Sequence, residues 1–104
     1  MTLEDRRLKL HAMLCDILGS RYVYYDPPAS ITMKYPAIIY EKARVDTRKA
    51  DNTSYLRNAG YTVTLIRKDD DDDTLDRLLD LPFASFDRSY TADNMHHDVL
   101  TIYI

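Results

Sequence analysis

The chain of 104 residues has little of the material from which catalytic and cofactor sites are built: no tryptophan, one cysteine and two glycines. A lone cysteine forms neither an intramolecular disulfide nor a thiolate metal site, so Cys15 is expected to be a buried, inert thiol. Gly19 and Gly60 cannot make a glycine-rich phosphate loop or a nucleophile elbow. No serine, cysteine or threonine stands in a pattern with a base and a third orienting group. The sequence therefore predicts no catalytic residue, no cofactor and no enzymatic activity.

Long apolar runs are also missing. Residues 1–7 are rich in charge, and no uninterrupted apolar stretch of signal-peptide or membrane-span length follows them. The length suits a single domain over residues 1–104 that needs no disulfide or metal to fold. We expect a protein that is made in a cytoplasm, stays there unless it leaves as part of an assembly, and has no membrane partner.

Charge is unevenly distributed along the chain. The net charge of −3 argues against a strongly basic nucleic-acid binder. Residues 34–57 nevertheless carry six basic residues against three acids, whereas residues 67–88 carry four basic residues against eight aspartates. Two patches of opposite sign suit head-to-tail self-association, in which the positive face of one copy meets the negative face of the next. A second interpretation is that both patches are simply solvated surface.

Hydrophobic periodicity predicts seven elements in the order α-β-β-β-α-β-β. A helix is expected over residues 3–18, with Thr2 as its N-cap and Gly19 as its C-terminal stop. The other expected elements are strands at 22–25, 36–42 and 61–66, a helix at 73–81, and hairpin strands at 83–91 and 98–104 across residues 92–95. The polar residues 46–54 have no periodicity and are expected to form a loop. This order predicts an α+β two-layer sandwich, a mainly antiparallel sheet with both helices on one face.

A run of five aspartates precedes the second predicted helix: Asp69, Asp70, Asp71, Asp72 and Asp73. Adjacent carboxylates in one short segment cannot all point at one cation, and the Asp/Asn-Gly pattern of a calcium loop is missing, so no metal site is predicted. A solvated helix N-terminus is the simplest interpretation. An acidic surface that faces a partner or a channel, and a weak divalent-cation site, stay open as alternatives.

His96 and His97 are the other candidate ligands or bases, but consecutive residues of a hairpin strand point to opposite faces.

Nine tyrosines stand out in composition, and they suit surfaces that are exposed to water in the free protein and buried in a complex. Tyr61 and Tyr103 are expected in the core, whereas Tyr24, Tyr25, Tyr55 and Tyr90 lie near predicted loops. The loop of residues 43–55 is the predicted subunit or partner interface, with these candidate residues: Arg44, Arg48, Lys49, Asp51, Asn52 and Tyr55.

The whole pattern resembles the tail terminator, or tail completion, proteins of long-tailed bacteriophages and prophages. Three features carry the resemblance: the strand Pro36-Ala37-Ile38-Ile39-Tyr40, the strand Tyr61-Thr62-Val63-Thr64-Leu65-Ile66, and the helix end Leu78-Leu79-Asp80-Leu81-Pro82. The polar loop with Asp51-Asn52 and Tyr55, and the run Asp93-Asn94-Met95-His96-His97 before a final strand, complete it.

This resemblance implies a structural assembly protein, a ring of usually about six copies that caps the tail tube, stops its growth and joins the tail to the head. The implied partners are further copies of the chain, the tail tube protein and a head-completion or neck protein, with DNA only passing through. The protein would assemble in the host bacterial cytoplasm and end in the tail neck of the virion. The interface elements of the family would map onto the loop of residues 43–55 and the edges of the sheet. The acidic run would face the lumen, where negative charge lets DNA pass.

Two other functions fit the residues. A small regulatory or nucleic-acid-binding module would use the basic residues 42–57. A metal-dependent hydrolase would use the aspartates with His96 or His97.

Overall fold

The computed structural model of the chain describes residues 2–50, 54–69 and 72–104, with the backbone alone for residues 47–50 and 54–57. The elements, in chain order, are α1 (Leu3–Leu18), β1 (Val23–Tyr25), β2 (Ala37–Ala50), β3 (Ser54–Arg67), α2 (Thr74–Leu79), β4 (Ala84–Ala92) and β5 (Met95–Tyr103). The five strands form one sheet in the order β1-β2-β3-β5-β4, in which β1 pairs parallel to β2 and all other neighbours are antiparallel. The predicted α+β fold and its element order are confirmed.

Helix α1 has the boundaries that its end signals predict. The Thr2 hydroxyl accepts a hydrogen bond from the Asp5 N–H at 3.0 Å, and the Asp5 carboxylate accepts one from the Thr2 N–H at 3.0 Å. This capping box satisfies donors that the first turn leaves free. At the other end Gly19 takes the left-handed conformation, with φ of 77°, and its N–H donates a hydrogen bond to the carbonyl of Cys15.

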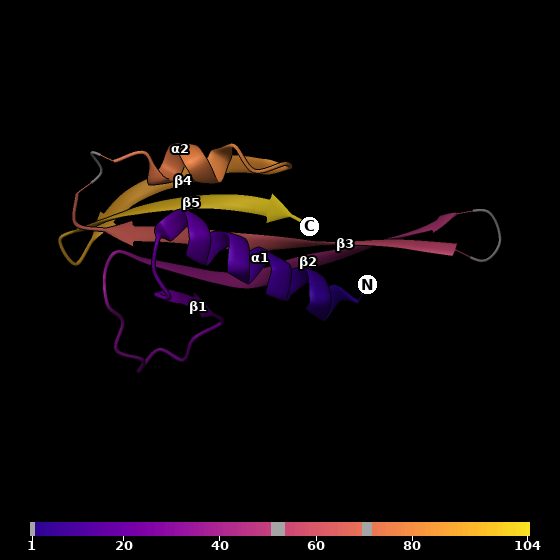
Figure 1. Ribbon diagram of the computed structural model, residues 1–104, viewed down its shortest axis with the longest axis horizontal. Helices are drawn as coiled ribbons and strands as arrows, with labels where there is room; N and C mark the ends of the chain where they lie inside the picture. Colours follow the sequence, from indigo (N-terminus) through magenta and orange to yellow (C-terminus); the bar gives the residue numbers. More distant parts are fainter. Residues whose placement is uncertain (1, 51–53, 70–71) are drawn as a thin grey trace.

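The core lies between the sheet and the helices. Leu10 and Leu14 of α1 and Leu78 of α2 belong to one buried cluster with the central strands (Figure 1). Full burial of one such leucine contributes about 1.5–3 kcal/mol. The strand residues of the cluster that are fully buried, or within 1% of it, are these: Ile38, Tyr40, Ala59, Tyr61, Val63, Leu65, Leu100 and Ile102. Both helices therefore pack on the same face of the sheet.

The predicted loop at residues 46–54 is wrong at residues 46–50 and 54, which belong to strands, whereas residues 51–53 lie outside the described residues. Strand β2 continues to Ala50 and β3 begins at Ser54, and their antiparallel register runs without a break from Arg44↔Gly60 to Ala50↔Ser54. The sequence of this segment has no apolar stripe, so the pattern that predicts a strand is missing although the backbone of the two described segments is paired.

The β4–β5 hairpin is longer and tighter than expected. Its turn is Asp93-Asn94, with φ of 53° and 60°, and β5 begins at Met95 rather than at residue 98. Two consecutive positive φ values are the mark of a two-residue type I′ turn, which aspartate and asparagine tolerate better than other residues except glycine. Helix α2 is also shorter than predicted, because it covers Thr74–Leu79 instead of residues 73–81.

A buried polar group links α1 to the sheet. The Tyr40 hydroxyl accepts a hydrogen bond from Arg7 Nη1 at 3.0 Å and lies 2.7 Å from His11 Nδ1. Burial and the charge of Arg7 lower the pKa of His11. The buried Tyr61 hydroxyl, in contrast, has no hydrogen-bond partner among the described residues. Tyr25 packs against both rings at centroid distances of 5.0 and 6.5 Å, so it serves the core rather than an interface.

These two tyrosines give the first prediction. Tyr40→Phe should lower the free energy of unfolding by about 1–3 kcal/mol, because Arg7 and His11 lose the hydroxyl that they contact in a part-buried site. Tyr61→Phe removes a hydroxyl that has no partner among the described residues, so it should change stability by less than about 0.5 kcal/mol. Urea unfolding of both variants at neutral pH tests the difference, and equal losses would contradict this account of the network.

Candidate assembly surface

The most distinctive feature of the surface is a two-stranded extension of the sheet, which we call the arm and define as residues 46–50 and 54–58. Figure 1 shows β2 and β3 continuing together well beyond the body, and the molecule measures 52 × 27 × 22 Å. Within the described part of the chain, these two segments pair only with each other. An isolated two-stranded ribbon is marginally stable at best in water. The arm is therefore a structure that gains from a covering surface.

The root of the arm is built by close packing around Gly60. The last contacts with the C-terminal strand are the backbone hydrogen bonds between Ala59 and Ile104, at 3.2 and 3.0 Å. A Cβ atom at Gly60 would lie 2.9 Å from the Tyr103 ring and 3.1 Å from Cγ of Arg44. On the opposite strand, the register shifts by one residue between Lys42 and Arg44, a bulge that increases local twist. These features position the arm relative to the body.

The arm and its root are basic. Residues 42–58 contain five basic residues against two aspartates. At the root, the exposed Arg44 side chain donates a hydrogen bond to Asp46 at 2.8 Å, which raises the pKa of Arg44. Other predicted interface residues lie on the arm strands themselves, at Arg48 and Lys49 of β2 and at Tyr55 of β3. The structure thus brings Arg44, Arg48, Lys49 and Tyr55 together on one extension, whereas Asp51 and Asn52 lie outside the described residues.

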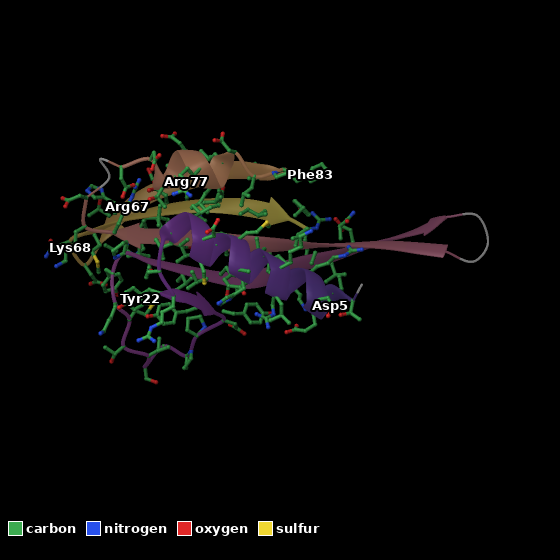
Figure 2. The ribbon with its side chains drawn as sticks, viewed as in Figure 1. Asp5, Tyr22, Arg67, Lys68, Arg77 and Phe83 are labelled. Atoms are coloured by element: carbon green, nitrogen blue, oxygen red, sulfur yellow. The ribbon has the colours of Figure 1, made fainter. Side chains whose placement is uncertain are left out.

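The acidic run is tied to the body by Asp72. Its carboxylate accepts a hydrogen bond from the Thr74 N–H at 3.1 Å and forms an ion pair with Arg67, and both interactions lower the pKa of Asp72. Arg67 is itself buried and also donates to Asp98 at 3.5 Å. Asp69, Asp72 and Asp73 are exposed, whereas Asp70 and Asp71 lie outside the described residues. In Figure 2, Arg67 lies at the end of the body opposite the arm.

The two consecutive histidines are part of the β4–β5 hairpin. His97 stacks on Tyr90 at a centroid distance of 4.7 Å, and its Nδ1 lies 3.1 Å from the carbonyl of Met95. His96 is opposite Arg67 and Thr91 in the register. Among the residues that the structure describes, no three His, Cys, Asp or Glu side chains group to hold a metal ion. Asp70 and Asp71, which a hydrolase site of the aspartates with His96 or His97 would also use, lie outside the described residues.

Strand β4 forms an edge of the sheet, which the sequence did not predict, although Tyr90 on this strand is one of the tyrosines predicted to lie near a loop. Every residue between the two ends of β4 is exposed. Phe86 is 48% exposed and Tyr90 44%. The signal in the sequence was that Ala84–Ala92 mixes polar and aromatic residues without a clean alternation, which is unusual for a strand with one face in the core. The position of β4 at the edge depends on β5 pairing with β3, which the sequence pattern does not specify.

A second exposed apolar surface lies at the root of the arm. Phe83 is 80% exposed and takes a φ of 61°, a left-handed conformation that bulky residues rarely adopt. It borders an open hollow of about 430 Å³, lined also by Met13, Leu81, Ile102 and Ile104 among others. Figure 2 places Phe83 at the end of the body from which the arm leaves. Exposed apolar surface of this kind is typical of interaction sites.

Comparison with known proteins gives no assignment. The sequence matches no known protein-family model and no curated protein. No helix in the described ranges is long and apolar enough to cross a membrane.

The packing at the arm root gives the second prediction. Gly60→Ala should lower the free energy of unfolding by about 1–3 kcal/mol, because the added methyl group would lie closer to the Tyr103 ring than a normal van der Waals contact allows. In a Tyr103→Ala background the same change should cost clearly less, since the ring is gone. Chemical unfolding of the four proteins of this cycle measures the coupling, and additive effects would contradict the proposed contact.

Proposed function

We propose that this protein is a structural subunit of a phage or prophage tail, forming a closed ring that caps the tail tube and joins it to the head. In this proposal the protein performs no reaction. Its partners are further copies of itself, the tail tube protein and a head-completion or neck protein, and DNA only passes through the ring. The ring assembles in the cytoplasm of the host bacterium and ends in the tail neck of the virion.

The arm is the observation that carries this proposal. A basic ribbon whose two strands pair only with each other within the described residues is poorly explained as part of a self-sufficient domain, because an isolated two-stranded ribbon is marginally stable in water. It is well explained as an element that is completed by a neighbour. The arm and the body surfaces are different, so a contact between them is head-to-tail, and a series of such contacts closes into a ring when the rotation permits.

Two further features support an assembly role. The exposed edge strand β4 and the exposed Phe83 offer apolar surface beyond what a monomer needs. The order and spacing of the elements resemble tail terminator proteins, and the element order is the one seen in the structure. The resemblance supplies the ring, its place at the tail tube and its partners, which the geometry alone does not specify.

A direct test is the native mass of the purified protein by light scattering over a concentration series, with and without magnesium. We expect a closed species of about six copies whose mass stops rising with concentration, because a ring leaves no free contact. A protein that stays monomeric throughout, or one whose mass grows without limit as in an open filament, would contradict the closed ring.

The basic arm also favours a second function, a small regulatory or nucleic-acid-binding module. The major groove of B-DNA admits a two-stranded β-ribbon, and residues 42–58 carry five basic residues. This module would bind duplex DNA with an affinity that falls steeply as salt rises, because each phosphate contact releases a counterion. A binding series between about 50 and 200 mM salt tests it. Tight, salt-sensitive DNA binding by a monomer favours the module, and its absence at low salt argues against it.

A further inference from the structure

We propose that the arm of one copy pairs along the free edge of β4 in the next copy. This inference rests on the proposed ring and specifies the contact within it: which surface of the neighbour covers the arm. The partner is a second copy of this chain.

Strand β4 offers a free edge of suitable length. It pairs only with β5 among the described strands, so its other edge is without a strand partner there. A bulge between Phe86 and Arg88 divides it, and the uninterrupted part beyond the bulge covers the five residues 88–92. Each strand of the arm also has five residues, 46–50 and 54–58. Exposed edge strands are templates for pairing with another chain, and equal lengths allow a full ladder of main-chain hydrogen bonds.

Charge favours the arm as the occupant of this edge. Helix α2 contacts β4, and the helix-side aspartates Asp73, Asp76 and Asp80 recur at a spacing that places them on one face. These three and Asp87 in the β4 bulge are exposed, and none has an ion-pair partner among the described residues. The nearest positive charge on the helix, Arg77, donates to the carbonyl of Ile17 of α1. Arg88 on β4 is also exposed, so α2 and β4 together carry four exposed aspartates against the two arginines Arg77 and Arg88. This net negative charge complements the basic arm.

The aromatic residues add to the match. Phe86 and Tyr90 leave about half of their surface exposed on β4, and the arm sequence contains Tyr55 and Leu56. Aromatic and aliphatic cross-strand neighbours are the pairs that stabilise sheets. Exposure alone would also suit an acidic wall facing a DNA lumen. Because α2 contacts β4, whose outer edge has no strand partner among the described strands, we assign Asp76, Asp80 and Asp87 to a subunit contact.

The geometry makes this contact head-to-tail. In Figure 1 the arm leaves one end of the body, whereas α2 and β4 form its long side, opposite β1. One copy therefore uses its arm to bind a neighbour and uses its β4 edge to receive another, so both surfaces of every subunit are covered once a ring closes.

Charge reversal of the two surfaces tests the proposal. The arm variant carries Arg44→Glu, Arg48→Glu and Lys49→Glu. The edge variant carries Asp80→Lys and Asp87→Lys, which avoid the first turn of α2, where a positive charge would weaken the helix. Each variant alone should lose self-association affinity on the order of a hundredfold, because like charges now face each other. The control, Asp16→Lys with Glu41→Lys, reverses two exposed acids away from β4 and should keep the wild-type mass.

An equimolar mixture of the arm and edge variants gives the decisive result. In the mixture the reversed arm meets the reversed edge, and the native arm of the edge variant meets the native edge of the arm variant. Association should return to near the wild-type level, in rings with alternating subunits. Circular dichroism and thermal unfolding of each variant confirm that it is folded before its mass is measured.

Other outcomes separate this contact from the ring itself. If the folded edge variant assembles as well as wild type, or if the mixture stays dissociated, the β4 contact is wrong while the ring stands. If both variants keep the wild-type mass and the arm variant alone loses binding to duplex DNA, the arm binds DNA and the contact is overturned. A wild-type protein that stays monomeric at every concentration overturns the contact and the ring together.

Discussion

The antiparallel pairing of β2 with β3 is the interaction on which the rest of the structure depends. Between Ala37 and Lys42 this ladder passes through the core, where it is covered by α1 and flanked by β1 and β5. Beyond the bulge after Lys42 the same ladder leaves the body as the arm. One continuous register therefore builds both the most buried and the most solvated parts of the sheet.

This continuity connects stability to function. The core half of the ladder gains from buried apolar area. The arm half gains main-chain hydrogen bonds, whose net contribution is modest because water competes for the same groups, and the ion pair between Arg44 and Asp46 at its root. The body thus stabilises an extension that would be marginal by itself. The core half of the ladder meets the arm half at Gly60, which packs against the Tyr103 ring.

Much of the fold could be predicted because its signals are local. Helix α1 has both its capping box and its terminal glycine in the sequence, and the alternation of β3 around Val63 marks a central strand. The arm could not be predicted because the sequence of its strands, residues 46–50 and 54–58, does not alternate apolar and polar residues, and alternation is the signal that identifies a strand. The edge position of β4 depends on strand order, and the anchoring of Asp72 by the buried Arg67 depends on tertiary contact. The prediction of Arg44, Arg48 and Lys49 as interface residues rests on their charge, on the polar segment that contains them and on the family resemblance, and the charge argument does not depend on whether the segment is a loop or a strand.

The most direct measurement of the central claim, that the arm is completed by a neighbour, is amide hydrogen exchange in the arm and in β4 at concentrations below and above self-association. The account predicts that protection of residues 46–50 and 54–58, and of residues 88–92 in β4, rises together with assembly, while β1 stays unchanged. Arm amides that exchange equally fast in the dilute and the concentrated protein, although its mass has increased, would contradict it.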